Sequence, residues 1–324
     1  MIARLSRTLP VVSLLALGAC ARAGGARIAP SPAPESRYVS SATGRDVGLE
    51  GVLQRAAGAD VVFLGEQHDD PATHRVELSI LAALGSGARP VVLSLEMFER
   101  DVQRVLDDYL AGKISEGEFL AKSRPWERYT TDYRGMVELA RARGWTVVAS
   151  NVPRRHATAV SRKGLAAIDS LPAAERGQVA RELICPRNDD YYTRFADTMK
   201  GHSAGGGPPT AADSAMMRSM TDRFYEAQCV KDETMAESIV AALAAAPKDA
   251  LVFHVDGAFH SDYGLGTAAR VRRRNPGARV LVLSAVPVDT VAQANAAPFA
   301  KRGDIVILTR KAPAAPPSPA APAK

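Results

Sequence analysis

The chain has 324 residues, 46% of them hydrophobic, so it can bury a full core, and about 270 residues remain for one large domain once the ends are set aside. Its 41 Lys and Arg against 35 Asp and Glu give a net charge of +6. The densest basic cluster, Arg270 to Arg274, closes a predicted helix, where cations favour the helix dipole. No nucleic-acid-binding signature accompanies the charge, so nucleic acid is excluded as the expected partner.

The N-terminus predicts an export signal over residues 1–20. Arg4 and Arg7 precede the apolar stretch Leu9 to Leu17, which is too short to span a bilayer, and small residues lead to Cys20. This ending is typical of a lipoprotein signal in which Cys20 becomes the lipidated first residue, and an ordinary secretory peptide is the alternative. No Asp follows Cys20, so we expect a bacterial outer-membrane lipoprotein that faces the periplasm or the cell surface.

Two segments at the ends lack the composition of a packed domain. Residues 21–45 are assigned to a flexible tether, because the stretch from Ala21 to about Arg37 is rich in Ala, Gly, Pro, Ser and Arg and cannot bury enough apolar surface. Residues 311–324 are Pro/Ala-rich and predict an extended or disordered tail. The folded domain is therefore expected over residues 46–310.

The first predicted helix has a clear start, with Asp70 at its cap and Pro71 in its first turn, and it runs to about Leu84. Strands and helices alternate through most of the domain, which predicts an α/β fold with a mostly parallel or mixed central sheet flanked by helices. The predicted strands are Val61 to Leu64, Pro90 to Phe98, Trp145 to Ser150, Ala250 to Val255, Arg279 to Ala285 and Asp304 to Thr309.

No strand pattern occurs between about residues 155 and 246, where helical patterns are broken by Gly and Pro. We expect this segment to be a helical insertion that forms a lid over the ligand edge of the sheet. Cys185 and Cys229 lie within it. In an exported protein they could form a disulfide, and two buried free thiols fit the sequence equally well.

Two similar motifs carry the strongest functional signal. Gly65-Glu66-Gln67-His68 and Gly257-Ala258-Phe259-His260 each place a His three residues after a Gly that ends a predicted strand. Ligands of open α/β sheets bind beyond the carboxyl ends of the strands. If the two strands are neighbours, both imidazoles point into one crevice, and Glu96 leaves a third strand at the same edge.

The set His68, His260, Glu66 and Glu96 could hold a divalent metal with open positions for water. A metal-bound water could then act as a nucleophile with a carboxylate as the base, which would make these four residues catalytic. Motifs of the commonest hydrolases and nucleotide-binding proteins, such as Gly-x-Ser-x-Gly and the phosphate-binding Gly-Lys-Ser/Thr loop, are absent.

Further polar residues follow the strands. Asn151 and Arg154 bracket one exit, where Arg154 could fork onto a substrate carboxylate or a porphyrin propionate, or form a salt bridge with Glu66 or Glu96. Tyr263 follows the second motif and could reach the crevice, whereas Asp262 is equally explained as a helix cap.

The remaining histidines have structural explanations. We expect His74 to be solvated or to pack on its helix, His254 to be a core residue with a satisfied nitrogen, His156 to belong to a helix start and His202 to lie in a surface loop.

Together these segments resemble the ChaN-like haem-binding uptake lipoproteins, in a superfamily with the Tiki/TraB proteins and the erythromycin esterases. The resemblance covers roughly Asp60 to Pro287. Its marks are Gly65-Glu66-Gln67-His68-Asp69 with His74, Leu95-Glu96-Met97-Phe98, Asn151-Val152-Pro153-Arg154, Ala227-Gln228 with Asp232 and Met235-Ala236, and Gly257-Ala258-Phe259-His260 running to Gly264-Leu265-Gly266.

This resemblance implies a membrane-anchored protein that binds haem in iron acquisition, a homodimer in which two haems stack, and an outer-membrane haem receptor as partner. It also implies a tyrosine as iron ligand with a histidine nearby, since phenolate is a hard donor that suits ferric iron. The choice among the tyrosines stays open: Tyr129, Tyr133, Tyr191, Tyr192 and Tyr263. The cofactor-binding set predicted for haem is His68, His260, Tyr263, Arg154, Asn151 and Tyr133.

The Tiki side of the resemblance implies a different activity. There both Gly-x-x-His units and a glutamate serve a metal-dependent hydrolase of peptide or ester bonds, with Mn, Co or Zn as the metal. His68, His260, Glu66 and Glu96 match that pattern. A non-catalytic envelope scaffold is the third hypothesis.

Overall fold

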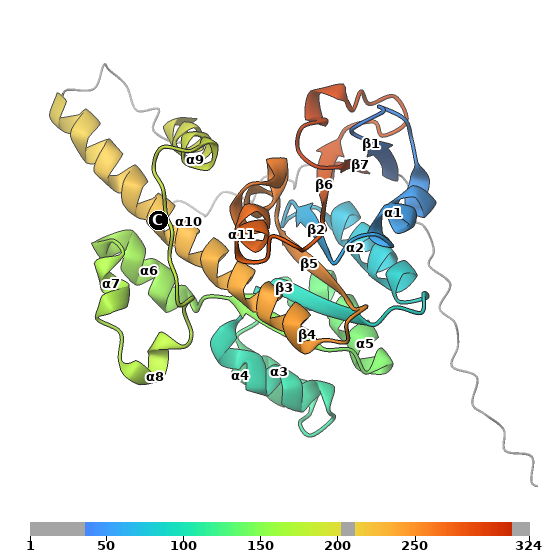
Figure 1. Cartoon of the computed structure of the whole chain (residues 1–324), viewed down its shortest axis with the longest axis horizontal. Helices are drawn as coiled ribbons and strands as arrows, with labels where there is room; N and C mark the ends of the chain where they lie inside the picture. The colour runs from blue at the N-terminus through green and yellow to red at the C-terminus, as the bar shows by residue number, and fades with distance from the viewer. Residues whose placement is uncertain (1–35, 202–210, 313–324) are drawn as a thin grey trace, which may run out of the picture.

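The computed structural model describes residues 36–201 and 211–312. The export signal with Cys20, His202 and nearly all of the predicted tail lie outside these ranges. A seven-stranded sheet forms the centre of the molecule, in the order β1-β7-β6-β2-β5-β3-β4 (Figure 1). All its strand pairs are parallel except β1 with β7, which confirms the predicted α/β fold with a mixed sheet.

The strands are β1 (Ser36–Ser40), β2 (Val61–Glu66), β3 (Val91–Glu99), β4 (Val147–Asn151), β5 (Leu251–Gly257), β6 (Val280–Val288) and β7 (Ile305–Arg310). The α-helices are α1 (Gly48–Ala56), α2 (Pro71–Leu84), α3 (Gln103–Leu110), α4 (Glu116–Ser123), α5 (Arg134–Arg143), α6 (Arg154–Lys163), α7 (Ala166–Asp169), α8 (Ala173–Arg176), α9 (Asp190–Gly201), α10 (Ala211–Ala245) and α11 (Gly266–Arg274).

Every strand predicted from the sequence is present. These strands could be predicted because continuous apolar runs are typical of strands that are covered on both faces. The expected boundary of the tether at residue 45 is wrong. Ser36–Ser40 forms β1, which pairs with β7 at the edge of the sheet, and α1 follows it. The local sequence hides this strand, because its pairing partner lies about 270 residues further along the chain.

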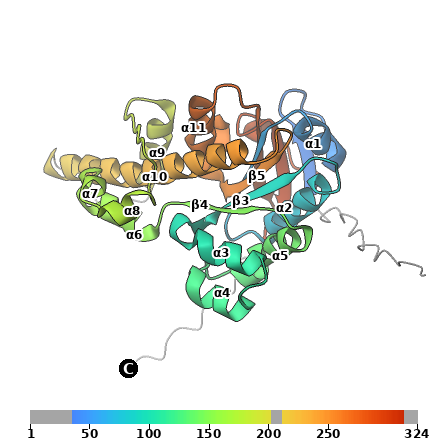
Figure 2. The ribbon, with the colours of Figure 1, turned by 60° about the horizontal axis from the view of Figure 1, so that its bottom comes forward.

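Helices cover both faces of the sheet. The side chains of α1 to α5 join the larger hydrophobic core on one face, and α10 and α11 pack on the other (Figure 2). The predicted start of α2 is confirmed, because the Asp70 carboxylate accepts hydrogen bonds from the backbone N–H groups of Ala72 and Thr73.

Within the described residues, the segment between β4 and β5 contains the helices α6 to α10 and no strand, as predicted for the insertion, and residues 177–189 form a loop between α8 and α9. The helix α10 spans the segment and packs against α6, α11 and β4. A separate small core lies between α6, α7 and α10. Cys185 and Cys229 form a disulfide, which fixes the segment before α9 to α10. Among the described helices, none has the length and apolar character needed to cross a membrane.

Candidate functional site

The topology brings the two Gly-x-x-His motifs to one edge of the sheet. Strand β5 lies between β2 and β3, and Glu66 at the end of β2 is in register with Gly257 at the end of β5. Beyond these strand ends lies a cavity of about 1070 Å³, called here the main cavity, and Glu66, His68, Glu96 and His260 all line it. The structure therefore places the four predicted residues around a common space.

His68 is the imidazole that faces this space. Its Nδ1 lies 2.5 Å from Glu66 Oε1, its side chain is 45% exposed, and its ring meets the edge of Trp126 at 4.8 Å between centroids. A Cβ on Gly257 would lie only 2.8 Å from His68 Nε2, so a glycine is required for this close approach. Burial lowers the pKa of His68, but Glu66 and Glu96 outweigh burial and raise it. In the neutral form, Glu66 fixes Nδ1 as the protonated nitrogen, which leaves a lone pair on Nε2.

A buried network holds Glu66 in turn. Tyr133 Oη donates to Glu66 Oε1 at 2.6 Å, and His74 Nδ1 lies 3.4 Å from Glu66 Oε2 and 3.2 Å from Glu77 Oε2. Burial opposes the charge of Glu66, but hydrogen bonds from His68 and His74 outweigh it and lower the pKa to about 2. Burial and the Glu66 charge raise the pKa of Glu77 well above its ordinary value, which favours the protonated form of Glu77.

His74 is buried, so the predicted solvated role is wrong and the packing role holds. Its Nε2 lies 3.3 Å from Asp132 Oδ2. Burial disfavours the charged form of His74, but hydrogen bonds with Glu66 and Glu77 outweigh burial and raise the pKa of His74 to about 11. His74 is therefore the cation that compensates a carboxylate behind His68.

His260 is held by carboxylates on both sides. Its Nδ1 lies 2.7 Å from Asp232 Oδ1, and its Nε2 lies 3.3 Å from Glu96 Oε1. Burial lowers the pKa of His260, but Glu96 and Asp232 outweigh burial and raise it to about 10. His260 is thus a buried imidazolium with both nitrogens occupied as donors.

In the imidazolium state His260 offers no lone pair. A metal bound there would take the place of the proton between Nε2 and Glu96 Oε1, with Asp232 still holding Nδ1. The described residues do contain one group of donor atoms that lie within 4.8 Å of one another, formed by Glu66, His74 and Glu77, and all three residues are buried. The predicted set of His68, His260, Glu66 and Glu96 does not meet that spacing.

The tyrosines separate into two kinds. Tyr129 and Tyr133 are buried in the core beneath β2 and β3, and Tyr191 is buried with its hydroxyl donated to Asp232 Oδ2 at 2.7 Å. Tyr192 donates to Asp222, outside the main cavity. Tyr263 is half-buried and lines the main cavity.

Tyr263 also has an unusual backbone. Its φ of 64° lies in the left-handed region, which is uncommon for a residue with a Cβ and turns its side chain away from the path of a regular helix. The guanidinium of Arg194 lies 3.4 Å from the centre of the Tyr263 ring.

Of the two polar residues at the exit of β4, Arg154 lines the main cavity and Asn151 does not. Arg154 is exposed and lines the main cavity, and none of the ion pairs among described residues joins it to Glu66 or Glu96, so the salt-bridge alternative is wrong. Asn151 was predicted to bind the cofactor. Its amide instead donates to the Glu96 carbonyl at 3.1 Å and accepts from the Val152 N–H, so it positions the backbone and does not line the cavity.

The two other described histidines match their structural explanations. His254 is buried in β5 with Nδ1 2.8 Å from Ser94 Oγ, and burial lowers its pKa to about 3, so it is neutral. His156 lies in the first turn of α6 and contacts Gln178.

Several lining residues were missed by the sequence analysis. Trp126, Phe195 and Lys231 line the main cavity and have no role in the sequence-based prediction. Asp232, which belongs to the motif set and likewise has no predicted role, is buried behind His260 and does not line the cavity. The helical segments that carry Phe195 and Lys231 reach the sheet edge only through the tertiary fold, so no local pattern identifies them.

Comparison with known proteins gives three results. The model of a family described as haem-binding uptake, Tiki superfamily, ChaN matches residues 52–271. The protein RETICULATA-RELATED 5, chloroplastic, of Arabidopsis thaliana is 27% identical over 244 residues, which cover 72% of this chain and only 32% of that protein.

Among solved structures, ChaN of Campylobacter jejuni with cofacial haem has a TM-score of 0.64 and 17% identity over 86% of this chain and 98% of that one. An erythromycin esterase, EreC, in its open conformation has a TM-score of 0.44 and 13% identity over 86% of this chain and 83% of that one. Since the family model spans more than half of the sequence, this chain belongs to the haem-binding uptake family ChaN of the Tiki superfamily.

Proposed function

We propose that this protein binds haem in the main cavity as a lipid-anchored protein of the bacterial envelope that serves haem and iron acquisition. The observation that carries the proposal is the composition of the cavity wall. Apolar and aromatic surface from Trp126, Phe195 and Phe259 lies beside the donors His68 and Tyr263. A porphyrin needs such a combination, because its ring is apolar and its iron takes an axial ligand.

The residues present fit this group. Two atoms that can bind iron reach the cavity without a hydrogen-bond partner among the described residues. They are the hydroxyl oxygen of Tyr263 and Nε2 of His68. Tyr133 and Tyr191 are poorer candidates, because each hydroxyl already donates to a buried carboxylate. We therefore assign Tyr263 as the iron ligand, and His68 as the histidine near it.

Titration of haemin into the purified domain tests this assignment. We expect a saturable change in the Soret band for the native protein, which Tyr263→Phe and His68→Ala each weaken. Tyr192→Phe is the matched control, since Tyr192 is half-buried on α9 and bonded to Asp222 away from the cavity. A flat titration of the native protein at micromolar concentration would refute haem binding.

The location and partners belong to the same proposal. An anchor at Cys20, a homodimer and an outer-membrane haem receptor agree with the family and with the sequence of the N-terminus. Replacement of Cys20 by Ser should release the protein from the membrane fraction, and sedimentation with and without haemin should show whether haem drives dimer formation. Retention of the Cys20→Ser variant in the membrane would argue against the anchor.

The metal-dependent hydrolase has less support. It requires a metal to replace the proton between His260 Nε2 and Glu96, while Asp232 can keep its bond to Nδ1, and the predicted ligands do not lie within 4.8 Å of one another. Metal analysis of the purified protein, with peptide and ester assays in added Mn, Co or Zn, tests it. Activity that is lost in His68→Ala would establish it over simple haem binding.

A further inference from the structure

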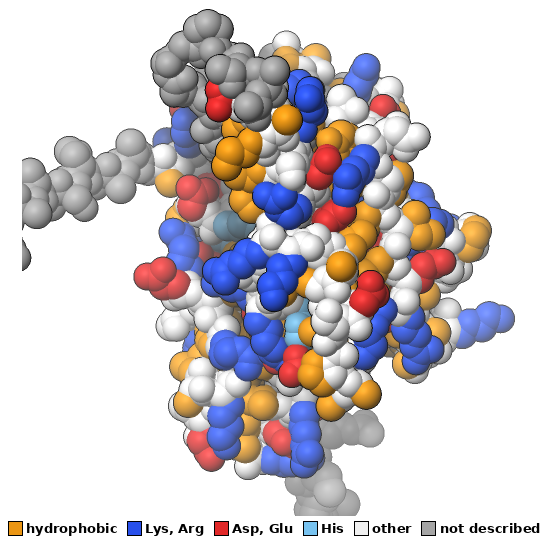
Figure 3. Space-filling view, turned by 90° about the vertical axis from the view of Figure 1, so that its left-hand side faces the viewer, with side chains coloured by type: hydrophobic (Ala, Val, Ile, Leu, Met, Phe, Trp, Pro, Cys, Tyr) orange, Lys and Arg blue, Asp and Glu red, His pale blue; other side chains and the backbone are white. Residues whose placement is uncertain are grey.

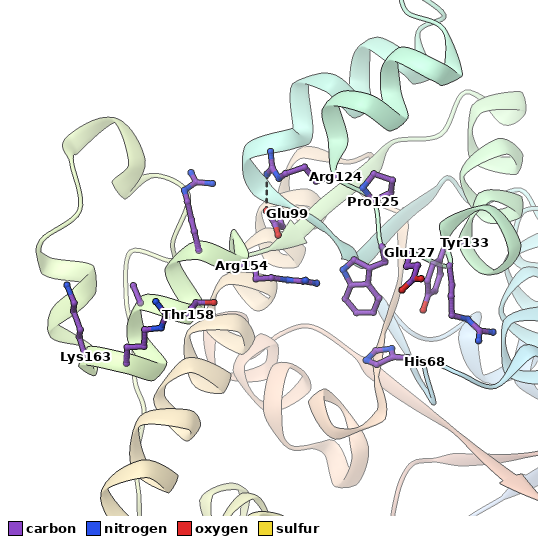
Figure 4. Close-up of a pocket in the computed structure, with 14 residues that line it drawn as sticks. His68, Glu99, Arg124, Pro125, Glu127, Tyr133, Arg154, Thr158 and Lys163 are labelled. Carbon is purple, nitrogen blue, oxygen red and sulfur yellow. Dashed lines mark hydrogen bonds and ion pairs between the residues drawn. The ribbon is translucent and has the colours of Figure 1, made fainter. Parts of the chain in front are cut away.

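A second cavity adjoins the main one. It has a volume of about 1060 Å³ and lies between α6 and the loop of residues 124–128, and it is called here the α6 cavity (Figure 4). His68, Trp126 and Arg154 line both cavities. The two spaces therefore meet at these residues, and a ligand that passes Trp126 from the main cavity enters the α6 cavity.

One face of α6 forms a wall of this cavity. Arg154, Thr158 and Arg162 follow one another at four-residue spacing, which places them on the same side of the helix, and Arg155, Ala159 and Lys163 run beside them. The small side chains at 158 and 159 leave open space between two pairs of cations. Figure 4 shows Arg154 extending from α6 toward the side of the cavity where His68 lies.

The charge of the α6 cavity is strongly unbalanced. Six of its lining residues are Lys or Arg and two are Glu, whereas the main cavity has four of each sign. Arg124, Arg128 and Arg155 form ion pairs with acidic residues. The other three, Arg154, Arg162 and Lys163, have no acidic partner among the described residues and are exposed.

The same excess is visible on the surface. In Figure 3, Lys and Arg side chains gather around a hollow on this side of the molecule, and a histidine is visible within it. Unpaired cations beside an aromatic wall suit an anionic ligand with a flat apolar body, because an Arg binds a carboxylate through two parallel hydrogen bonds.

We propose that the α6 cavity binds the carboxylate-bearing edge of the tetrapyrrole whose ring occupies the main cavity. This inference rests on the proposed haem binding and adds the orientation of the ligand. Arg154 contacts the carboxylates at the junction of the cavities, and Arg162 with Lys163 provides the charge beyond it. The ring then lies with its iron toward Tyr263 and its acidic edge toward α6.

The test compares three ligands on the same variants. Haemin carries both propionates, haemin dimethyl ester carries neither, and protoporphyrin IX keeps the propionates but lacks iron. Binding is followed by the Soret band for the iron porphyrins and by quenching of tryptophan fluorescence for all three. We expect native protein to bind haemin at least about tenfold more tightly than the ester, as for the loss of a charged hydrogen bond.

The double variant Arg162→Gln with Lys163→Gln should remove part of that preference. Adding Arg154→Gln, at the residue that contacts the carboxylates, should remove most of the preference and weaken the binding of protoporphyrin IX by a similar factor. Arg104→Gln is the matched control, because Arg104 is an exposed arginine on α3 that lines neither cavity. Since all these side chains are exposed, unchanged circular dichroism and melting temperature should verify the fold.

Two results would overturn the inference while leaving haem binding intact. In the first, the variant with all three substitutions keeps the full preference for haemin over its ester. In the second, Lys231→Gln in the main cavity removes the preference instead, which would place the acidic edge there. By contrast, failure of native protein to bind any of the three ligands would refute the proposed function itself.

Discussion

Replacement of His74 by Gln removes the cation from a buried group of acids. The imidazole contacts Glu66 at 3.4 Å, Glu77 at 3.2 Å and Asp132 at 3.3 Å, and the side chains of Glu66 and Glu77 are fully buried. Loss of one partner leaves the Glu66 carboxylate without its cation in a site that water does not reach. Breaking a buried ion pair in this way costs about 3–5 kcal/mol of unfolding free energy.

Urea denaturation of His74→Gln at neutral pH measures this cost, and the melting temperature should fall by roughly 10 °C. Glu77→Gln provides the matched control. Because burial and the Glu66 charge raise the pKa of Glu77 and favour its neutral form, we expect that an amide of similar shape costs much less. The double variant His74→Gln with Glu66→Gln should recover part of the loss, since it removes the orphaned charge.

The pH dependence supplies a second readout. The pKa of His74 is raised in the folded state, so its contribution is complete below the unfolded value of 6.5 and is lost as pH rises through about 11. Native protein should therefore lose stability steadily above neutral pH, and His74→Gln should flatten that slope. If His74→Gln costs no more than Glu77→Gln, the assignment of a buried cation is wrong.

Three further changes test other parts of the molecule. Cys185→Ser should lower the unfolding free energy by about 4 kcal/mol, because it opens the loop that the disulfide with Cys229 closes. Reduction of the native protein should cause the same loss, and an unchanged unfolding free energy under reducing conditions would refute this. Gly257→Ala should displace the His68 ring and weaken haemin binding while the protein stays folded, because its Cβ would lie 2.8 Å from Nε2; native affinity would contradict this. Asp232→Asn should lower the pKa of His260 from about 10, as followed by NMR of the ring protons, and an unchanged value would show that Asp232 does not stabilise the imidazolium.

The sequence was sufficient to predict strands β2 to β7, because each of them is a short apolar run with polar residues at its exit. It could not reveal β1, whose five residues become a strand only by pairing with β7. The convergence of His68, Glu66, Glu96 and His260 on one cavity was predicted from strand ends alone.

The chemistry of those residues was less predictable. Whether an imidazole is a ligand or a buried cation depends on which carboxylates the fold brings to it, as Asp232 from α10 shows for His260. His74 was misjudged for the same reason. The basic face of α6 had a local signal, since Arg154 and Arg162 are eight residues apart on one helix, but only the fold shows that this face lines a cavity.

The order of the strands has a consequence for the biogenesis of the site. Strand β5 separates β2 from β3 in space although it follows them by about 185 and about 150 residues in sequence. A nascent chain that has emerged only as far as β4 thus lacks the central strand of its binding edge, together with Tyr263 and the Asp232–His260 pair. Under the proposed function, haem binding requires nearly the whole polypeptide, so we expect a truncated or stalled product not to bind haem.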